Sequence, residues 1–294
     1  MENLRDVRLR MRAIRQTLQV TRAMKLISTA KLRKGRRMLE NMEPYFSRIQ
    51  KSMFDILSGI GINDSKFFRA AEGESVSRTA VLVITSDKGF AGGYNANIFR
   101  QVNQLCAGLK NPVLILAGAI GYRYFSHSPW PIVENFSFDS RLPSLDDAEG
   151  IAEYIVSQFL WGIFAEVHIV YTHMHSSLKL VPREQQILPL NGEKMQNEFE
   201  KSGGKRAELR FEYWPSMEEV FDHLVPLYVK GIIYGSLVEA YASEQSARMT
   251  AMDEAGKNAG EILDDLQVHY NRVRQAGITQ EMTEIIGGAA ALSN

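Results

Sequence analysis

The sequence predicts an α/β fold combined with a long antiparallel α-helical coiled coil, in which a Rossmann-like α/β domain is inserted between N- and C-terminal long helices. Three observations predict it. From Leu227 to Asn294 the chain contains no proline and is rich in strong helix formers. Apolar residues recur at heptad spacing through residues 1–60. All nine prolines lie between Pro44 and Pro226, so the middle of the chain has a distinct, turn-rich composition.

The N-terminal coiled-coil helix is expected over residues 1–60. Its apolar heptad positions follow one frame: Leu4, Val7, Met11, Ile14, Leu18, Leu32, Leu39, Met42, Phe46, Ile49, Met53, Ile56 and Ile60. Within the same frame Thr21, Lys25, Ser28 and Gly35 are small or polar, so this helix is not a simple two-stranded zipper along its whole length. Because the frame stays in phase across Pro44, we expect one helix with a local bend at the proline.

The C-terminal coiled-coil helix is expected within residues 211–294. Ser216 and Glu219 have the spacing of a capping box, so the helix should begin there. It carries a weaker stripe of apolar and small residues: Val238, Ala242, Met249, Met252, Ala259, Leu263, Leu266, Tyr270 and Val273. From Leu227 to the end it would be about 100 Å long at ~1.5 Å per residue. A helix that long must be covered by another long helix, by other subunits, or by both.

Residues 61–210 are expected to form a linker followed by the inserted Rossmann-like domain. Apolar, β-branched runs predict buried strands over residues 79–85, 112–117 and 166–172, with one or two more within 179–190. Helices are expected over residues 95–109 and 146–161, with a short helix and a proline-rich loop between them. Alternation of strands and helices is typical of a doubly wound sheet.

Charge is unevenly divided along a chain whose formal net charge is zero. Residues 1–40 hold twelve Lys and Arg against three Asp and Glu, whereas residues 215–294 hold five against twelve. Oppositely charged antiparallel helices attract each other, which supports their pairing. A basic helix could alternatively bind nucleic acid or an anionic membrane. We favour a solvated or subunit-facing surface, and no nucleic-acid partner.

Cysteine usage and hydropathy exclude several classes of protein. Cys106 is the single cysteine, so a disulfide framework and a metal–thiolate cluster are excluded. No apolar run approaches the ~18 residues that a membrane span requires. The Arg-rich start resembles a transit peptide in composition, but its heptads continue in frame into the body of the chain. We therefore interpret it as part of the structure.

Candidate sites for chemistry are few. The loop Thr85–Asn95 follows a predicted strand and precedes a predicted helix, where phosphate-binding loops lie, but it matches neither G-x-G-x-x-G nor G-x-x-x-x-G-K-[ST]. A tight strand-to-helix turn is the favoured interpretation. His168, His173 and His175 have no cysteine or carboxylate at ligand spacing. We expect no catalytic residue, no cofactor and no metal site.

Several short motifs occur in order along the chain. They are Thr21–Lys25 with Ala30–Arg33, Thr85–Gly89 with Gly92–Asn95, Ala242–Gln245 with Ala247–Met249, Tyr270–Asn271 with Arg274–Ala276 and Ile278–Glu281, and finally Gly287–Leu292. With these motifs the chain resembles the gamma subunit of F-type ATP synthases, the central rotor shaft. The resemblance covers both ends strongly and the middle through its order of strands and helices.

The resemblance implies a subunit that is not itself catalytic. The coiled coil would enter a hexamer of alpha and beta subunits, and the α/β domain would bind the epsilon subunit and the membrane c ring. Rotation of the shaft, driven by protons or sodium ions, would change nucleotide affinity at each catalytic site in turn. Membrane association would be indirect, peripheral on the cytoplasmic face of a bacterial plasma membrane.

The resemblance also implies contact residues. Met24 and Lys25 would lie near acidic loops of the beta subunits. Four further residues would meet the stator of the motor: Arg248, Arg274, Gln275 and Thr279. Phe211 and Tyr213 would approach the c ring and the epsilon subunit.

Two other functions remain as alternatives. The first is a Rossmann-like nucleotide-binding enzyme with a coiled-coil oligomerisation arm. It requires that the inserted domain bind a nucleotide. The second is a basic coiled coil that binds nucleic acid, for which affinity should fall steeply with salt.

Overall fold

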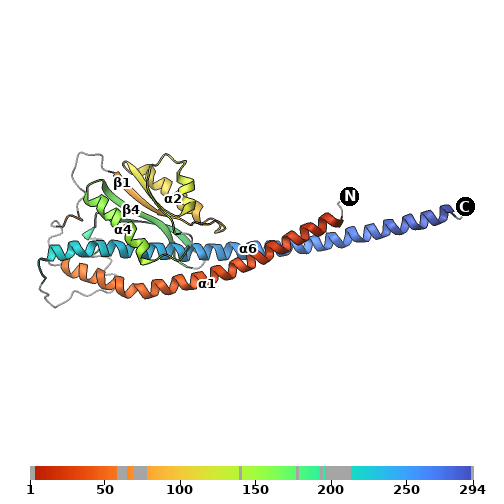
Figure 1. The fold of residues 1–294 in the computed structure, drawn as a ribbon, viewed down its shortest axis with the longest axis horizontal. Coiled ribbons are helices and arrows are strands. Elements are labelled where there is room, and N and C mark those ends of the chain that lie inside the picture. Colours follow the sequence, from red (N-terminus) through yellow and green to blue (C-terminus); the bar gives the residue numbers. More distant parts are fainter. Residues whose placement is uncertain are drawn as a thin grey trace. The chain divides into compact units, whose positions relative to one another are not determined.

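The computed structural model describes residues 4–57, 65–68, 78–138, 141–176, 179–192, 195 and 213–292. Two long helices, α1 (Leu4–Leu57) and α6 (Met217–Leu292), lie at the two ends of the chain (Figure 1). The chain divides into two compact units, Met1–Thr29 with Arg248–Asn294, and Ala30–Ala247. We call them the terminal unit and the sheet unit. Each unit contains a part of both helices.

Helix α1 confirms the prediction of one helix that continues through Pro44. Every heptad position from Leu4 to Ile56 is buried or half-buried, including the polar Thr21 and Ser28. The residues between these positions are mostly exposed, so the frame identifies the face that packs. Ile60, the last position of the predicted frame, lies outside the described residues.

Helix α6 begins where the capping pattern predicts. The backbone N–H of Glu219 donates to the Ser216 hydroxyl at 3.2 Å. The helix starts at Met217, the residue after Ser216. Pro226 lies inside the helix. All nine residues of the predicted stripe, from Val238 to Val273, are buried or half-buried.

The two helices run antiparallel within the terminal unit. Lys25 Nζ lies 2.5 Å from Asp253 Oδ1, and Arg8 Nη2 donates to the Tyr270 hydroxyl at 2.9 Å. Partner numbers fall on α6 as they rise on α1, which is the antiparallel direction. Gly256 faces Thr21 so closely that an added Cβ would lie 3.4 Å from the threonine hydroxyl. The predicted antiparallel pair is therefore present in this unit.

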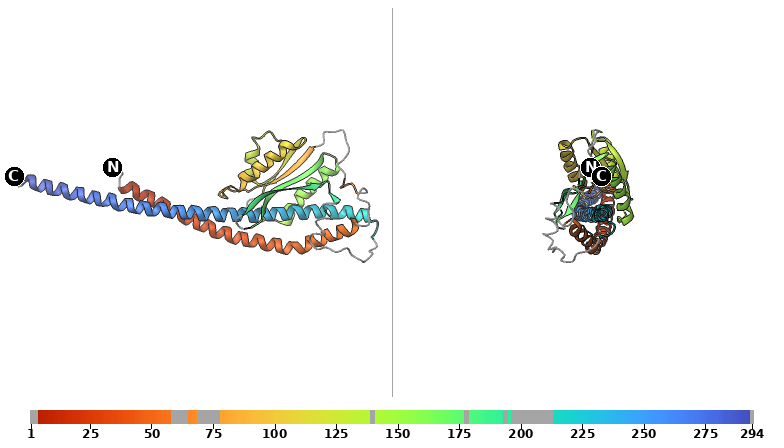
Figure 2. Two further views of the ribbon diagram at one scale, coloured as in Figure 1. Left: turned by 180° about the vertical axis from the view of Figure 1, so that it is seen from behind. Right: turned by 90° about the vertical axis from the view of Figure 1, so that its left-hand side faces the viewer.

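The same direction of pairing holds within the sheet unit. The rings of Phe46 and Tyr228 stack with centroids 5.5 Å apart. A Cβ on Gly231 would lie 2.5 Å from the Phe46 ring, and one on Gly35 would lie 3.3 Å from Ala242. Figures 1 and 2 show these parts of α1 and α6 side by side. Small residues allow this close approach because a larger side chain would collide with the facing helix.

The inserted domain is a five-stranded sheet with the order β3-β2-β1-β4-β5. Its strands are β1 (Arg78–Ile84), β2 (Pro112–Ala117), β3 (Ile132–Phe136), β4 (Phe164–Met174) and β5 (Leu180–Leu188). Neighbouring strands are parallel except β4 and β5, which are antiparallel. The helices between the strands are α2 (Tyr94–Gly108), α3 (Ala119–Phe125) and α4 (Leu145–Leu160). This strand order is that of a Rossmann-like sheet, as predicted.

Helices cover both faces of the sheet. On one face Leu82 of β1 belongs to a core that includes Ile151 of α4 and Val229 of α6. On the other face Val83 packs in a core with Ile98 of α2. Successive residues of β1 thus serve opposite cores. This is why β1 reads as a continuous apolar run instead of an alternating one.

Strand β3 corrects the sequence analysis, which expected only a proline-rich loop between the short helix and the helix over residues 146–161. Its residues are half-buried or exposed, so no buried run or clean alternation marks it. It pairs with β2 from Leu114 to Ala117 at the edge of the sheet. Pairing with β2, rather than its own sequence pattern, specifies this strand.

Candidate functional site

The loop after β1 leads into α2, and its side chains accept hydrogen bonds from the start of the neighbouring helix α3. The backbone N–H of Ala119 donates to the Asp87 carboxylate at 3.0 Å, and the N–H of Gly121 donates to the Thr85 hydroxyl at 3.0 Å. These donors stand at the start of α3, where the helix dipole attracts negative charge. A side chain of the protein itself already supplies that charge.

The rest of the loop is also held by hydrogen bonds and close contacts within the protein. Asn95 accepts the backbone N–H of Ser86 at 3.1 Å and donates to the Ser86 hydroxyl at 2.7 Å. Gly118 has a φ of 119°, and a Cβ there would lie 2.4 Å from the Thr85 carbonyl oxygen. Asp87 and these close contacts hold the loop as a tight turn, which is the interpretation that the sequence favours.

The crevice at the carboxyl ends of β1 and β4 is filled by α6. In doubly wound sheets this crevice, where the strand order reverses, is the usual ligand site. Here the Ser243 hydroxyl donates to the Thr172 carbonyl oxygen at 2.9 Å, and the Tyr94 hydroxyl donates to the Ala240 carbonyl oxygen at 3.2 Å. Ser243 is wholly buried. The helix therefore lies where a dinucleotide would need to enter, which disfavours the nucleotide-binding enzyme.

Other side chains that could react or bind a metal are hydrogen-bonded, ion-paired or buried. Burial raises the pKa of the Cys106 thiol to about 11, so the reactive thiolate is scarce at neutral pH. His168 lies between two carboxylates, with Nδ1 2.9 Å from Glu184 and Nε2 3.4 Å from Glu166. Among the described residues no group of His, Cys, Asp and Glu is arranged to hold a metal ion. None of the described helices is long and apolar enough to cross a membrane.

The predicted contact residues of α1 lie in the terminal unit. Met24 and Lys25 are both half-buried. The Lys25 ammonium is paired with Asp253, which also lies 3.4 Å from Lys257 Nζ. The hydrogen bond from Lys25 lowers the pKa of Asp253 below its ordinary value, and the charge of Lys257 adds to the effect. The lysine charge that was expected to face a partner is thus held partly by its own helix pair.

Three predicted contact residues of α6 lie in a stretch that is exposed throughout, Arg274–Ala289. Arg274 and Gln275 point side chains into solvent, and the Thr279 hydroxyl donates to the Gln275 carbonyl oxygen at 2.9 Å. The same stretch exposes four large apolar side chains that are not among the predicted contact residues: Ile278, Met282, Ile285 and Ile286. Their helical spacing was the available signal. We call residues 274–289 the exposed stretch.

The remaining predicted residues differ in their surroundings. Arg248 is only 7% exposed, so it offers little surface to another subunit, and its role as a stator contact stays a prediction. Tyr213 is half-buried, and burial together with the charge of Asp55 raises its pKa. Phe211 lies outside the described residues.

Comparison with known proteins gives a consistent result. A family model described as ATP synthase matches residues 3–292. The chain is 41% identical to a protein named ATP synthase gamma chain from Acetivibrio thermocellus, covering 99% of this chain and 100% of that one. It is 37% identical to the sodium ion specific ATP synthase gamma chain of Acetobacterium woodii, covering 99% of each.

Solved structures share the fold. A chain from the Euglena gracilis mitochondrial ATP synthase complex of OSCP, F1 and c-ring superposes with a TM-score of 0.67 at 16% identity, covering 98% of this chain and 94% of that one. A chain from the central stalk and c-ring structure of the Tetrahymena thermophila mitochondrial ATP synthase gives a TM-score of 0.61 at 24% identity, covering 80% of this chain and 99% of that one.

Proposed function

The chain belongs to the ATP synthase gamma-chain family, and we propose that it is the rotor shaft of a rotary F-type ATP synthase. The observation that carries the proposal is the exposed stretch of α6. Large apolar side chains on a lone helix are normally covered by a partner, because leaving them in water forgoes the free energy of burial. A surrounding ring of alpha and beta subunits supplies that cover.

In this role one asymmetric helix pair faces three chemically identical catalytic subunits. Each subunit meets a different side of the shaft and is held in a different conformation. Turning the shaft exchanges these contacts and so shifts the population of each subunit between states of different nucleotide affinity. The size of the shift is limited by the difference in contact free energy between the states.

The predicted contact residues of α1 and α6 would have different roles in this motor. Arg274, Gln275 and Thr279 would contact the stator, and the exposure of all three supports this role. Met24 and the Lys25–Asp253 pair would present a half-buried surface to the beta subunits. Arg248 would act from a buried position, through the shape of the helix around it.

The sheet unit would serve as an attachment domain without chemistry of its own. Asp87 accepts the Ala119 N–H at the start of α3, and Ser243 helps α6 to fill the strand-end crevice. We propose that this unit carries the epsilon subunit and docks on the c ring, with Tyr213 near that contact. Membrane association would then be peripheral, on the cytoplasmic face of the plasma membrane, and mediated by partner subunits.

Single-molecule rotation tests the proposal directly. Cys106 is 1% exposed and its thiol pKa is raised, so a cysteine introduced at the exposed Ala96 of α2 should label selectively. The chain would be purified with alpha and beta subunits, and a bead attached through Ala96→Cys. We expect stepwise rotation on addition of ATP. A chain that does not co-purify with these subunits, or a bead that stays still while ATP is hydrolysed, would overturn the proposal.

A further inference from the structure

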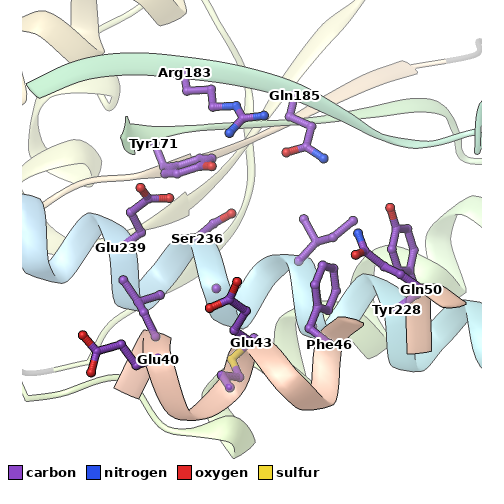
Figure 3. Close-up of a pocket in the computed structure, with 15 residues that line it drawn as sticks. Glu40, Glu43, Phe46, Gln50, Tyr171, Arg183, Gln185, Tyr228, Ser236 and Glu239 are labelled. Atoms are coloured by element: carbon purple, nitrogen blue, oxygen red, sulfur yellow. The ribbon is translucent and has the colours of Figure 1, made fainter. Parts of the chain in front are cut away.

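A pocket of about 750 Å³ lies between α1, α6 and strands β4 and β5, within the sheet unit (Figure 3). Its floor is α6, one wall is α1, and the other wall is formed by Tyr171 of β4 with Arg183 and Gln185 of β5. Sites for small molecules typically measure ~300–1,000 Å³. The pocket is therefore large enough for a small organic ligand, and it is separate from the strand-end crevice that α6 fills.

Two charged side chains of opposite sign line opposite walls of this pocket. Glu43 projects from α1 and Arg183 from β5, and Figure 3 shows both directed towards the space between the walls. Within the described part of the chain neither side chain has an ion pair or a hydrogen bond. A ligand that carries both charges would match both walls.

The other two carboxylates of the pocket are differently placed. Glu239 accepts the backbone N–H of Met174 at 3.3 Å. It also lies 2.5 Å from His173 Nδ1, a close approach that lacks hydrogen-bond geometry. Glu40 points away from the other labelled side chains in Figure 3. Glu43 is thus the carboxylate available to a ligand in the pocket.

An apolar end adjoins these charges. The stacked rings of Phe46 and Tyr228 line the pocket, and Ile232 lies on its floor. A second hollow of about 150 Å³ adjoins the pocket beneath β5 and is lined largely by polar side chains, so the apolar contacts come from Phe46, Tyr228 and Ile232 of the pocket itself. An aromatic or large aliphatic side chain would gain both burial and ring contacts there.

We propose that this pocket binds a free α-amino acid with an aromatic or large aliphatic side chain. The ammonium lies against Glu43, the carboxylate against Arg183, and the side chain against Phe46 and Tyr228. A ligand with one sign of charge would leave one of the two facing charges unmatched, which favours the zwitterion. Guanidinium groups suit carboxylates because they offer paired N–H donors. This site is independent of the rotor function.

Calorimetry on the full chain at low salt tests the proposal with three ligands. L-Phenylalanine carries both charges, L-phenylalaninamide lacks the carboxylate, and N-acetyl-L-phenylalanine lacks the ammonium. We expect saturable binding of phenylalanine and a loss of roughly five-fold in affinity for each of the other two, the upper range for an exposed ion pair. Absence of saturable phenylalanine binding would refute the site.

Two variants test which side chain of the pocket binds each charged group of the ligand. Glu43→Gln should bind phenylalanine and N-acetylphenylalanine about equally, because the partner of the ammonium is gone. Arg183→Gln should likewise bind phenylalanine and phenylalaninamide about equally. This is the coupling expected of directly interacting groups. If the loss of binding free energy caused by the variant instead adds to the loss caused by altering the ligand, these side chains do not contact the ligand.

Glu153→Gln is the matched control. Glu153 is exposed on α4 and does not line the pocket, and the substitution changes net charge by the same amount as Glu43→Gln. We expect it to leave all three affinities unchanged. An equal loss in Glu153→Gln and Glu43→Gln would mean that overall charge, and not a site, governs binding.

Discussion

Two stretches of the single helix α6 have opposite surroundings. From Tyr228 to Ser246 every residue is buried or half-buried, because α1 lies on one side of the helix and the sheet on another. From Arg274 to Ala289 every residue is exposed. We call the first the buried stretch. Both stretches have helix-forming sequences and both contain isoleucine and glycine, so composition alone does not separate them. The comparison shows that one helix can belong to the core in one segment and lie exposed in another.

The largest expected difference between the stretches comes from removing the same side chain. Ile233→Ala in the buried stretch should lower the free energy of unfolding by about 2–5 kcal/mol, since Ile233 is wholly buried and a cavity would remain. Ile285→Ala in the exposed stretch should change it by less than about 0.5 kcal/mol, since Ile285 is 71% exposed. Urea unfolding followed by circular dichroism measures both. Equal losses would contradict the assignment of the two surroundings.

Glycine should respond with opposite signs in the two stretches. Gly231→Ala should destabilise the sheet unit by about 1–2 kcal/mol, because the new Cβ would lie 2.5 Å from the Phe46 ring. Gly277→Ala meets nothing within 4 Å and should stabilise its helix by about 0.5–1 kcal/mol. Unfolding reports the first change, and amide hydrogen exchange of residues 274–289 reports the second. Adding Phe46→Leu should relieve the cost at Gly231, and a cost unaffected by Phe46 would refute the steric cause.

Gln275 tests whether the exposed stretch acts only in the complex. Gln275→Ala should leave the stability of the isolated chain within about 0.5 kcal/mol of the original, because the side chain is exposed. In the assembled complex it should lower rotation-coupled ATP hydrolysis. Gln267→Ala is the matched control, since Gln267 is exposed on the same helix outside the exposed stretch. Unchanged hydrolysis with Gln275→Ala would show that this position is passive.

The smallest effect on stability is expected at Asp253, which lies in the part of α6 between the buried and the exposed stretch. There α6 pairs with α1. Its pKa is lowered in the folded chain, first by the hydrogen bond from Lys25. Folding therefore gains from this pair at pH values above the ordinary pKa of 3.8, and the gain is lost as the pH falls through the lower folded pKa.

Asp253→Asn removes this titration. The difference in melting temperature between the original chain and Asp253→Asn should be largest near neutral pH and should shrink as the pH falls below 3.8. A difference that stays constant across this range would mean that Asp253 does not titrate with folding. Because the Asp253 side chain is 37% exposed, salt should also reduce the difference at neutral pH.

Local pattern was sufficient for the long elements. The heptad frame of α1 identified its buried face from Leu4 to Ile56, and Ser216 marked the start of α6. Strand β2 has the bounds that its apolar run predicts. These features depend on residues close together in sequence, namely side-chain periodicity, capping and β-branching, and so they can be read without knowing the fold.

The candidate site depended more on distant contacts. Sequence spacing suggested that Thr85–Asn95 is a turn, but not that Asp87 binds the start of α3 or that α6 fills the neighbouring crevice. The exposure of Gln275 and the burial of Arg248 were equally hidden, because both residues lie on one helix with similar local composition. The exposure of each residue depends on which distant segment of the chain packs against that part of α6.

By itself the sequence determined the two long helices, their packing faces and most strands of the sheet, because these are set by local propensity and periodic spacing. The family resemblance came from short motifs that occur in order along the chain. Only the tertiary structure decided that β3 joins the sheet edge, that α6 closes the ligand crevice, and that Lys25 is held by Asp253. Those outcomes are set by segments tens to hundreds of residues apart in the chain, and local spacing carries no information about which of them meet.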